Sequence, residues 1–140
     1  MTRSGCLLDT GPLVALVDRS DDRHEQAKMI FEALESPFLT CESVISESIF
    51  LLREVRPAGP DAILSLGKEG YYQIGMTLKD NFDPIREIII KYKEHSVSLA
   101  DASLIRCAEI YKEARILTFD SDFEFYRWGR NKRFEIIGGV

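Results

Sequence analysis

Acidic side chains follow the apolar segments of this sequence, at positions from which they could do chemistry together. The run Cys6–Leu8 stops at Asp9, and the run 116–119 is followed closely by Asp120 and Asp122. In α/β proteins, ligands bind outside the carboxyl ends of the strands, so an acid that ends a strand faces the ligand. We therefore expect Asp9, Asp120 and Asp122 to meet at one edge of a sheet.

Two more acids stand near the starts of expected helices, which share that edge in a parallel sheet. Asp101 lies in the first turn of the helix that follows Ser98, and Glu47 lies near the start of an earlier helix. The helical neighbours of Glu47 include Val44 and Phe50. A carboxylate beside apolar side chains is poorly placed for water, which favours a cation as its partner.

Carboxylates that converge in this way repel one another unless a cation neutralises them. Ligand oxygens alone suit Mg²⁺ or Mn²⁺ better than zinc, which favours nitrogen and sulfur. One such ion, or two about 4 Å apart, can activate a water molecule for attack on a phosphodiester and stabilise the leaving oxygen. The expected ligands are Asp9, Glu47, Asp101 and Asp120, with Asp122 as a fifth.

Each acid also has a simpler interpretation when it is taken alone. Asp9 suits the positive end of a helix dipole, and Asp101 fits a capping box. Asp120 and Asp122 suit a turn or a helix cap, and Glu47 can extend to solvent. The combination of all of them, rather than any single one, favours a metal site.

Strands and helices alternate along the chain. The expected strands span residues 5–8, 38–40, 71–74, 115–119 and 134–137. The expected helices span residues 11–18, 23–35, 43–55, 61–69, 78–93, 99–113 and about 121–128. Thr10 is expected to cap the first helix, with Pro12 in its first turn. This alternation predicts an α/β fold in which helices cover both faces of a parallel sheet, giving three layers.

Length and composition indicate the number of domains and exclude several classes of protein. The 140 residues predict a single domain over 1–140, and the net charge of −5 argues against a generic basic nucleic-acid binder. No apolar run approaches the ~18 residues of a membrane span, and residues 1–4 lead straight into the first strand without a signal peptide, so a cytoplasmic protein is expected. Three cysteines in apolar surroundings indicate reduced core thiols.

At these motifs the sequence resembles PIN-domain ribonucleases, most closely the VapC-like toxins of type II toxin–antitoxin pairs. The matching segments are Leu7–Leu13, Ile45–Glu47, Ser98–Ala102 and Leu117–Phe123. The segment Asp21-x-x-His24-x-x-Ala27 also matches one that recurs in these toxins. Where such toxins often place an Asp shortly after a tyrosine, this chain has Glu94 after Tyr92.

The resemblance implies a fold, an activity and partners. It implies a five-stranded parallel sheet in the order 3-2-1-4-5 and Mg²⁺- or Mn²⁺-dependent endonucleolytic cleavage of RNA. By resemblance, Asp9, Glu47, Asp101 and Asp120 form the catalytic acidic quartet and bind metal together with Asp122, while the hydroxyl of Thr118 supports the site. The implied partners are RNA, an antitoxin protein and a second copy of the chain. Ile49 and Leu52 could form exposed apolar surface for contact with the antitoxin or the second copy, or they could simply pack in the core.

A basic run near the carboxyl terminus has two interpretations that stay open. It could hold single-stranded RNA through phosphate contacts and base stacking, or it could be the solvated tail of a short helix. The residues concerned are Arg127, Trp128, Arg130 and Lys132.

The sequence lacks the motifs that several other functions require. A haloacid-dehalogenase-like phosphatase needs a second Asp where this chain has Gly11. No Gly-x-Ser-x-Gly elbow or Walker sequence is present. The alternatives that remain are a housekeeping RNA-processing PIN nuclease and a non-catalytic PIN-fold module that binds proteins. Loss of a quartet acid would mark the module, and no quartet acid is lost here.

Overall fold

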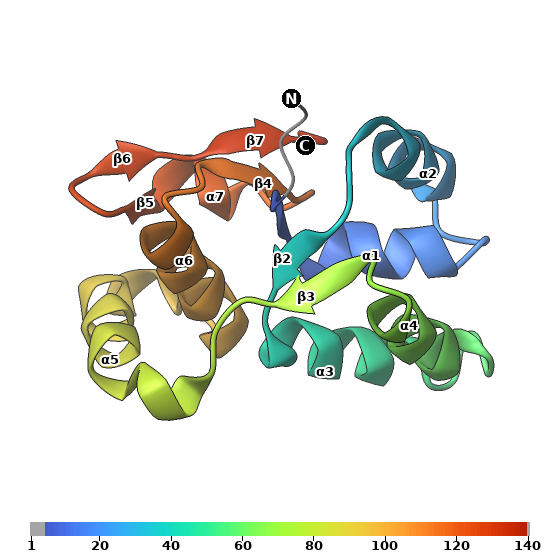
Figure 1. The fold of residues 1–140 in the computed structure, drawn as a ribbon, viewed down its shortest axis with the longest axis horizontal. Coiled ribbons are helices and arrows are strands. Elements are labelled where there is room, and N and C mark those ends of the chain that lie inside the picture. The colour runs from blue at the N-terminus through green and yellow to red at the C-terminus, as the bar shows by residue number, and fades with distance from the viewer. Residues whose placement is uncertain (1–4, 140) are drawn as a thin grey trace.

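A parallel sheet of short strands forms the centre of the computed structural model, which describes residues 5–139 (Figure 1). Its strand order is β3-β2-β1-β4-β7. The strands are β1 (Leu7–Leu8), β2 (Phe38–Thr40), β3 (Tyr72–Ile74), β4 (Arg115–Leu117) and β7 (Glu135–Ile137). The order implied by the resemblance is thereby confirmed, with β7 as the fifth strand of the sheet. The expectation for residues 1–4 lies outside the described residues.

Helices cover both faces of this sheet. In Figure 1, α5 and α6 lie to the left of the strands, while α1, α2 and α4 lie to the right. The helices are α1 (Thr10–Val17), α2 (His24–Ala33), α3 (Glu42–Leu52), α4 (Gly59–Lys68), α5 (Phe82–Lys91), α6 (Leu99–Tyr111) and α7 (Asp122–Phe125). The three-layer α/β prediction is confirmed. In the described part of the chain, no helix combines the length and apolar character that crossing a membrane requires.

The core lies where β1 and β4 pair beneath α6. Leu7 and Leu8 pair with Ile116 and Leu117, and all of these side chains are buried. A strand buried on both faces requires a continuous apolar run, which is why these segments do not alternate with polar residues. The cysteines are free and buried, as the sequence indicates: Cys6, Cys41 and Cys107.

The helix expected over 78–93 is interrupted at Asn81. A short 3₁₀-helix spans Leu78–Asp80, and α5 begins only at Phe82. The side chain of Asn81 explains the break, because its Nδ2 donates to Thr77 O at 2.8 Å and its Oδ1 accepts from Arg106 Nε at 2.9 Å. Pro84 then falls in the first turn of α5, where its missing N–H breaks no helical hydrogen bond.

The helix expected over 121–128 is wrong beyond Phe125. Arg127–Trp128 (β5) instead pairs antiparallel with Lys132–Arg133 (β6). Gly129 and Asn131 adopt positive φ angles of 57° and 61° between the two strands, a conformation that glycine and asparagine tolerate best. The basic run is therefore a β-hairpin and not the tail of a helix.

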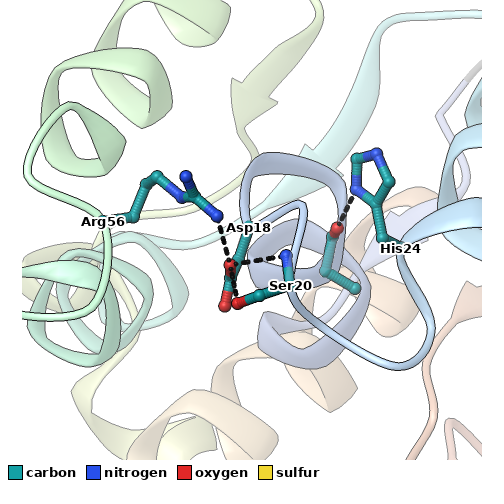
Figure 2. A network of polar contacts seen from close by, with 5 residues as sticks. Asp18, Ser20, His24 and Arg56 are labelled. Atoms are coloured by element: carbon teal, nitrogen blue, oxygen red, sulfur yellow. Dashed lines mark hydrogen bonds and ion pairs between the residues drawn. The ribbon is translucent and has the colours of Figure 1, made fainter.

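The carboxyl end of α1 is fastened by two sets of hydrogen bonds (Figure 2). Asp18 Oδ1 accepts from Ser20 Oγ at 2.7 Å and from an Arg56 guanidinium nitrogen at 3.1 Å. The hydrogen bonds from Ser20 and the nearby Arg56 charge lower the pKa of the Asp18 carboxyl. His24 Nδ1 lies 2.8 Å from Ala15 O, so His24 holds α2 against α1.

Candidate active site

Asp9 is the most buried acid of the site, with 7% of its surface exposed. It ends β1 and caps α1, because its Oδ1 accepts from the backbone N–H of Thr10 at 2.8 Å. The expectation that Thr10 is the cap is therefore wrong. Asp9 Oδ2 accepts from Thr118 Oγ1 at 2.7 Å. Burial raises the pKa of Asp9, and the charges of Asp120 and Glu47 add to this effect, while the Thr118 and Thr10 hydrogen bonds oppose it.

Glu47 reaches the same place from α3. The hydroxyl of Thr10 donates to Glu47 Oε2 at 3.2 Å. Glu47 is exposed, and so are Phe50 (58%) and Leu51 (48%) on the same side of the helix. The expectation that Glu47 is poorly placed for water is therefore wrong, because Phe50 and Leu51 face solvent although Val44 is buried.

Asp101 combines the two roles that its sequence suggests. Its backbone N–H donates to Ser98 Oγ at 3.0 Å, so Ser98 caps α6. Its carboxylate Oδ2 accepts from the hydroxyl of Tyr126 at 3.1 Å. Burial, followed by the charge of Asp9, raises the pKa of Asp101 to about 7. The cap fixes the backbone, and the carboxylate stays available to the site.

Asp120 and Asp122 lie in the segment between β4 and α7. The backbone N–H of Asp120 donates to Thr118 Oγ1 at 3.0 Å, and Asp120 Oδ1 accepts from the N–H of Asp122 at 2.9 Å. Carboxylate oxygens of Asp101, Asp120 and Asp122 all lie within 4.8 Å of one another. Asp122 thus joins the acids that the strand pattern predicts, at metal-ligand spacing.

One cleft of about 630 Å³ collects all four acids of the predicted quartet. Its lining includes Asp9, Glu47, Asp101 and Asp120. Within residues 5–139, no lysine or arginine forms an ion pair with any of them. Because oxygen ligands gather here with uncompensated like charge, the residues present fit a hard divalent cation.

The sequence analysis does not predict that two hydroxyl groups hold acids of the site. Thr10 holds Glu47, and Tyr126, which is fully buried, holds Asp101. Burial raises the pKa of Tyr126, so its hydroxyl stays protonated and able to donate. The available signal was its position four residues after Asp122, which one helical turn brings back toward the acids.

The basic hairpin presents fewer free groups than its sequence suggests. Trp128 is only 6% exposed, and its Nε1 donates to Arg133 O at 3.1 Å. A guanidinium nitrogen of Arg127 donates to backbone carbonyls at the end of α7. Arg130 and Lys132 are exposed, with Lys132 Nζ 4.9 Å from the centre of the Trp128 ring.

The apolar side chains of α3 divide between core and surface. Leu52 is fully buried and Ile49 is partly buried against the core, so core packing accounts for Leu52. Phe50 and Leu51 are the exposed apolar residues of this helix.

Comparison with known proteins identifies the family. The sequence profile described as "PIN domain" matches residues 6–129, so the chain belongs to the PIN-domain family. Ribonuclease VapC26 of Mycobacterium tuberculosis is 23% identical over 117 residues, which cover 81% of this chain and 85% of that protein. The crystal structure of M. tuberculosis VapC20, described as a sarcin-ricin loop cleaving toxin, aligns with a TM-score of 0.74 at 20% identity, over 83% of this chain and 90% of that one. The resemblance stated from the sequence is confirmed.

We expect Asp101→Asn to stabilise the metal-free protein at pH 8. The folded-state pKa of about 7 exceeds the 3.8 of an ordinary Asp carboxyl, so the stability that this carboxyl contributes is fully present below pH 3.8 and is lost as pH rises through 7. Removing the charge should raise the free energy of unfolding by about 1–2 kcal/mol, after allowance for solvent screening. Urea denaturation in EDTA at pH 5 and pH 8 measures this.

The matched control is Asp22→Asn, which changes an exposed acid that does not line the cleft and should leave the pH dependence unaltered. A loss of stability at pH 8 in Asp101→Asn would show that the carboxylate is not under repulsion there.

Proposed function

We propose that this chain is a metal-dependent endoribonuclease that hydrolyses RNA phosphodiester bonds, and that it is the toxin of a toxin–antitoxin pair. The observation that carries the proposal is the cleft in which Asp9, Glu47, Asp101 and Asp120 meet, with no ion pair to a lysine or arginine among residues 5–139. Membership of the PIN-domain family and the ribonuclease name of its M. tuberculosis relative support it.

The proposed cofactor is Mg²⁺ or Mn²⁺, held by the quartet and Asp122 directly or through water. When bound, such an ion activates water and stabilises negative charge on the phosphoryl and leaving oxygens. The chain's own part is to fix the ligands. Thr118 orients Asp9, Thr10 orients Glu47 and Tyr126 orients Asp101, each through one hydroxyl hydrogen bond. Such partners set ligand position and basicity.

The proposed RNA contacts outside the cleft come from the hairpin. Arg130 and Lys132 are exposed and carry positive charge that can meet phosphates. Arg127 and Trp128 contribute to the same proposal by shaping the hairpin, since the first binds backbone carbonyls and the second is buried. The exposed Phe50 and Leu51 of α3 are candidates for contact with a second copy of the chain or with an antitoxin.

Cleavage of RNA tests the activity directly. We expect the wild-type chain to cleave single-stranded RNA with Mg²⁺ or Mn²⁺ and to lose this activity in EDTA. Asp101→Asn should lower the rate by on the order of 100-fold or more, because it removes a ligand charge. Denaturing gels of an end-labelled RNA measure the rate, with Asp22→Asn as the unaffected control. Activity that survives both chelation and Asp101→Asn would contradict the proposal.

Metal titration tests the ligands separately from activity. By calorimetry, Asp9→Asn should abolish or strongly weaken Mn²⁺ binding. Tyr126→Phe should weaken it about tenfold, because Asp101 loses its hydroxyl donor. Tyr111→Phe is the matched control, since it removes a comparable hydrogen bond to Gly75 O that does not involve the cleft. Equal affinity in wild type and Asp9→Asn would rule out this metal site.

Induced expression tests the toxin role. We expect wild-type protein to arrest bacterial growth and Asp101→Asn to leave growth normal, because arrest requires RNA cleavage. Co-expression of the neighbouring upstream gene should restore growth if it encodes the antitoxin. Mapping of RNA ends in arrested cells identifies the target. Normal growth with a catalytically active wild type would favour a housekeeping nuclease.

A further inference from the structure

Two exposed rings stack on each other, one on the segment before α6 and the other at the end of α7. Phe125 ends α7 and is 49% exposed, and His95, which is also exposed, ends a 3₁₀-helix over Lys93–His95. Their centroids are 3.9 Å apart and their planes differ by 18°. We call them the His95–Phe125 pair. Exposed stacked rings of this kind are not needed for the core, which leaves their purpose to be explained.

Both rings stand on segments that also carry the site. Phe125 is three residues after Asp122, so the two share one side of the single turn of α7. The next residue, Tyr126, donates its hydroxyl hydrogen to Asp101. His95 is three residues before Ser98, which lines the cleft. The centre of the Phe125 ring lies 6.4 Å from that of Tyr126, so the pair is linked to Asp101 through this one buried tyrosine.

The pair is held in place from beneath. The buried ring of Tyr92 lies edge-on to Phe125, with 5.8 Å between centroids. The Tyr92 hydroxyl in turn accepts from the backbone N–H of Arg127 at 2.8 Å. A planar surface fixed in this way loses little conformational entropy when a third ring stacks on it.

We propose that the His95–Phe125 pair is a stacking platform for one base of single-stranded RNA, adjacent to the phosphate at the acids. This rests on the proposed ribonuclease function and names how that site holds its substrate. Bases stack on aromatic rings with little sequence preference. The charges around the pair are of both signs: Lys93 and Glu94 are exposed on the same turn as His95, Glu124 is exposed next to Phe125, and the basic hairpin follows α7 directly. The positive groups can meet the phosphates on either side of a stacked base. Trp128, the aromatic suggested by the sequence, is buried and cannot serve.

The test measures RNA affinity in an Asp120→Asn background, in which cleavage is removed. Added to this background, Phe125→Leu should weaken binding of a short single-stranded RNA by about 5- to 100-fold, because one stacked base is lost. Phe125→Tyr should retain affinity. Phe82→Leu is the matched control, since Phe82 is a comparably exposed phenylalanine, 62% at the start of α5, that is not part of the pair. Fluorescence anisotropy gives the dissociation constants.

A second variant keeps the proposal testable if Phe125→Leu unfolds. Phe125→Trp adds one indole to a chain whose single native tryptophan is buried. We expect its emission to be quenched by the RNA and not by an abasic oligomer of the same length. Unchanged affinity in Phe125→Leu, or equal quenching by both oligomers, would overturn the platform. Cleavage by the wild type, measured alongside, reports separately on the ribonuclease activity.

Discussion

Repulsion among carboxylates is the constraint around which this protein is arranged. Asp9 is almost fully buried beside Asp120 and Glu47. Burial raises the pKa of Asp9 and of Asp101, and the charges of the neighbouring carboxylates raise both further. Hydrogen bonds from hydroxyl groups hold each buried acid in place. Asp9 and Asp101 also sit at the amino ends of α1 and α6, where the helix dipole favours negative charge. A divalent cation completes this compensation in the function proposed.

The register of two very short strands sets the centre of the site. Leu8 pairs with Leu117, and the backbone N–H of Asp9 donates to Leu117 O at 3.0 Å. This alignment places Asp9 level with Thr118 and so produces their side-chain hydrogen bond. A shift by one residue would turn the strand's side chains to the opposite face. The buried apolar residues on both strands therefore protect the site geometry as well as the stability of the fold.

The sequence was informative where one local signal and one general rule sufficed. Acids after apolar runs, together with the rule for parallel sheets, predicted that Asp9 and Asp120 meet. Features that depend on distant partners were not predictable. Asn81 breaks a helix because Arg106, far along the chain, binds its side chain. The helix α7 is too short for a periodic pattern, so its end and the following hairpin were misread. The sequence predicted that Glu47 lies with the other acids. Its exposure to solvent was not predictable, because it depends on the rotation of α3 about its axis.

The turn of α7 and the residue that follows it carry both buried and exposed side chains. Phe123 and Tyr126 are buried, and Phe123 packs edge-on against Tyr126 and Phe134. Asp122 and Phe125 are exposed. Phe123 and Tyr126 anchor the turn, so the exposed Phe125 can be exchanged at little cost in folding free energy. Among related chains, this turn is therefore a place where the preference for a substrate can diverge while the scaffold beneath it is preserved.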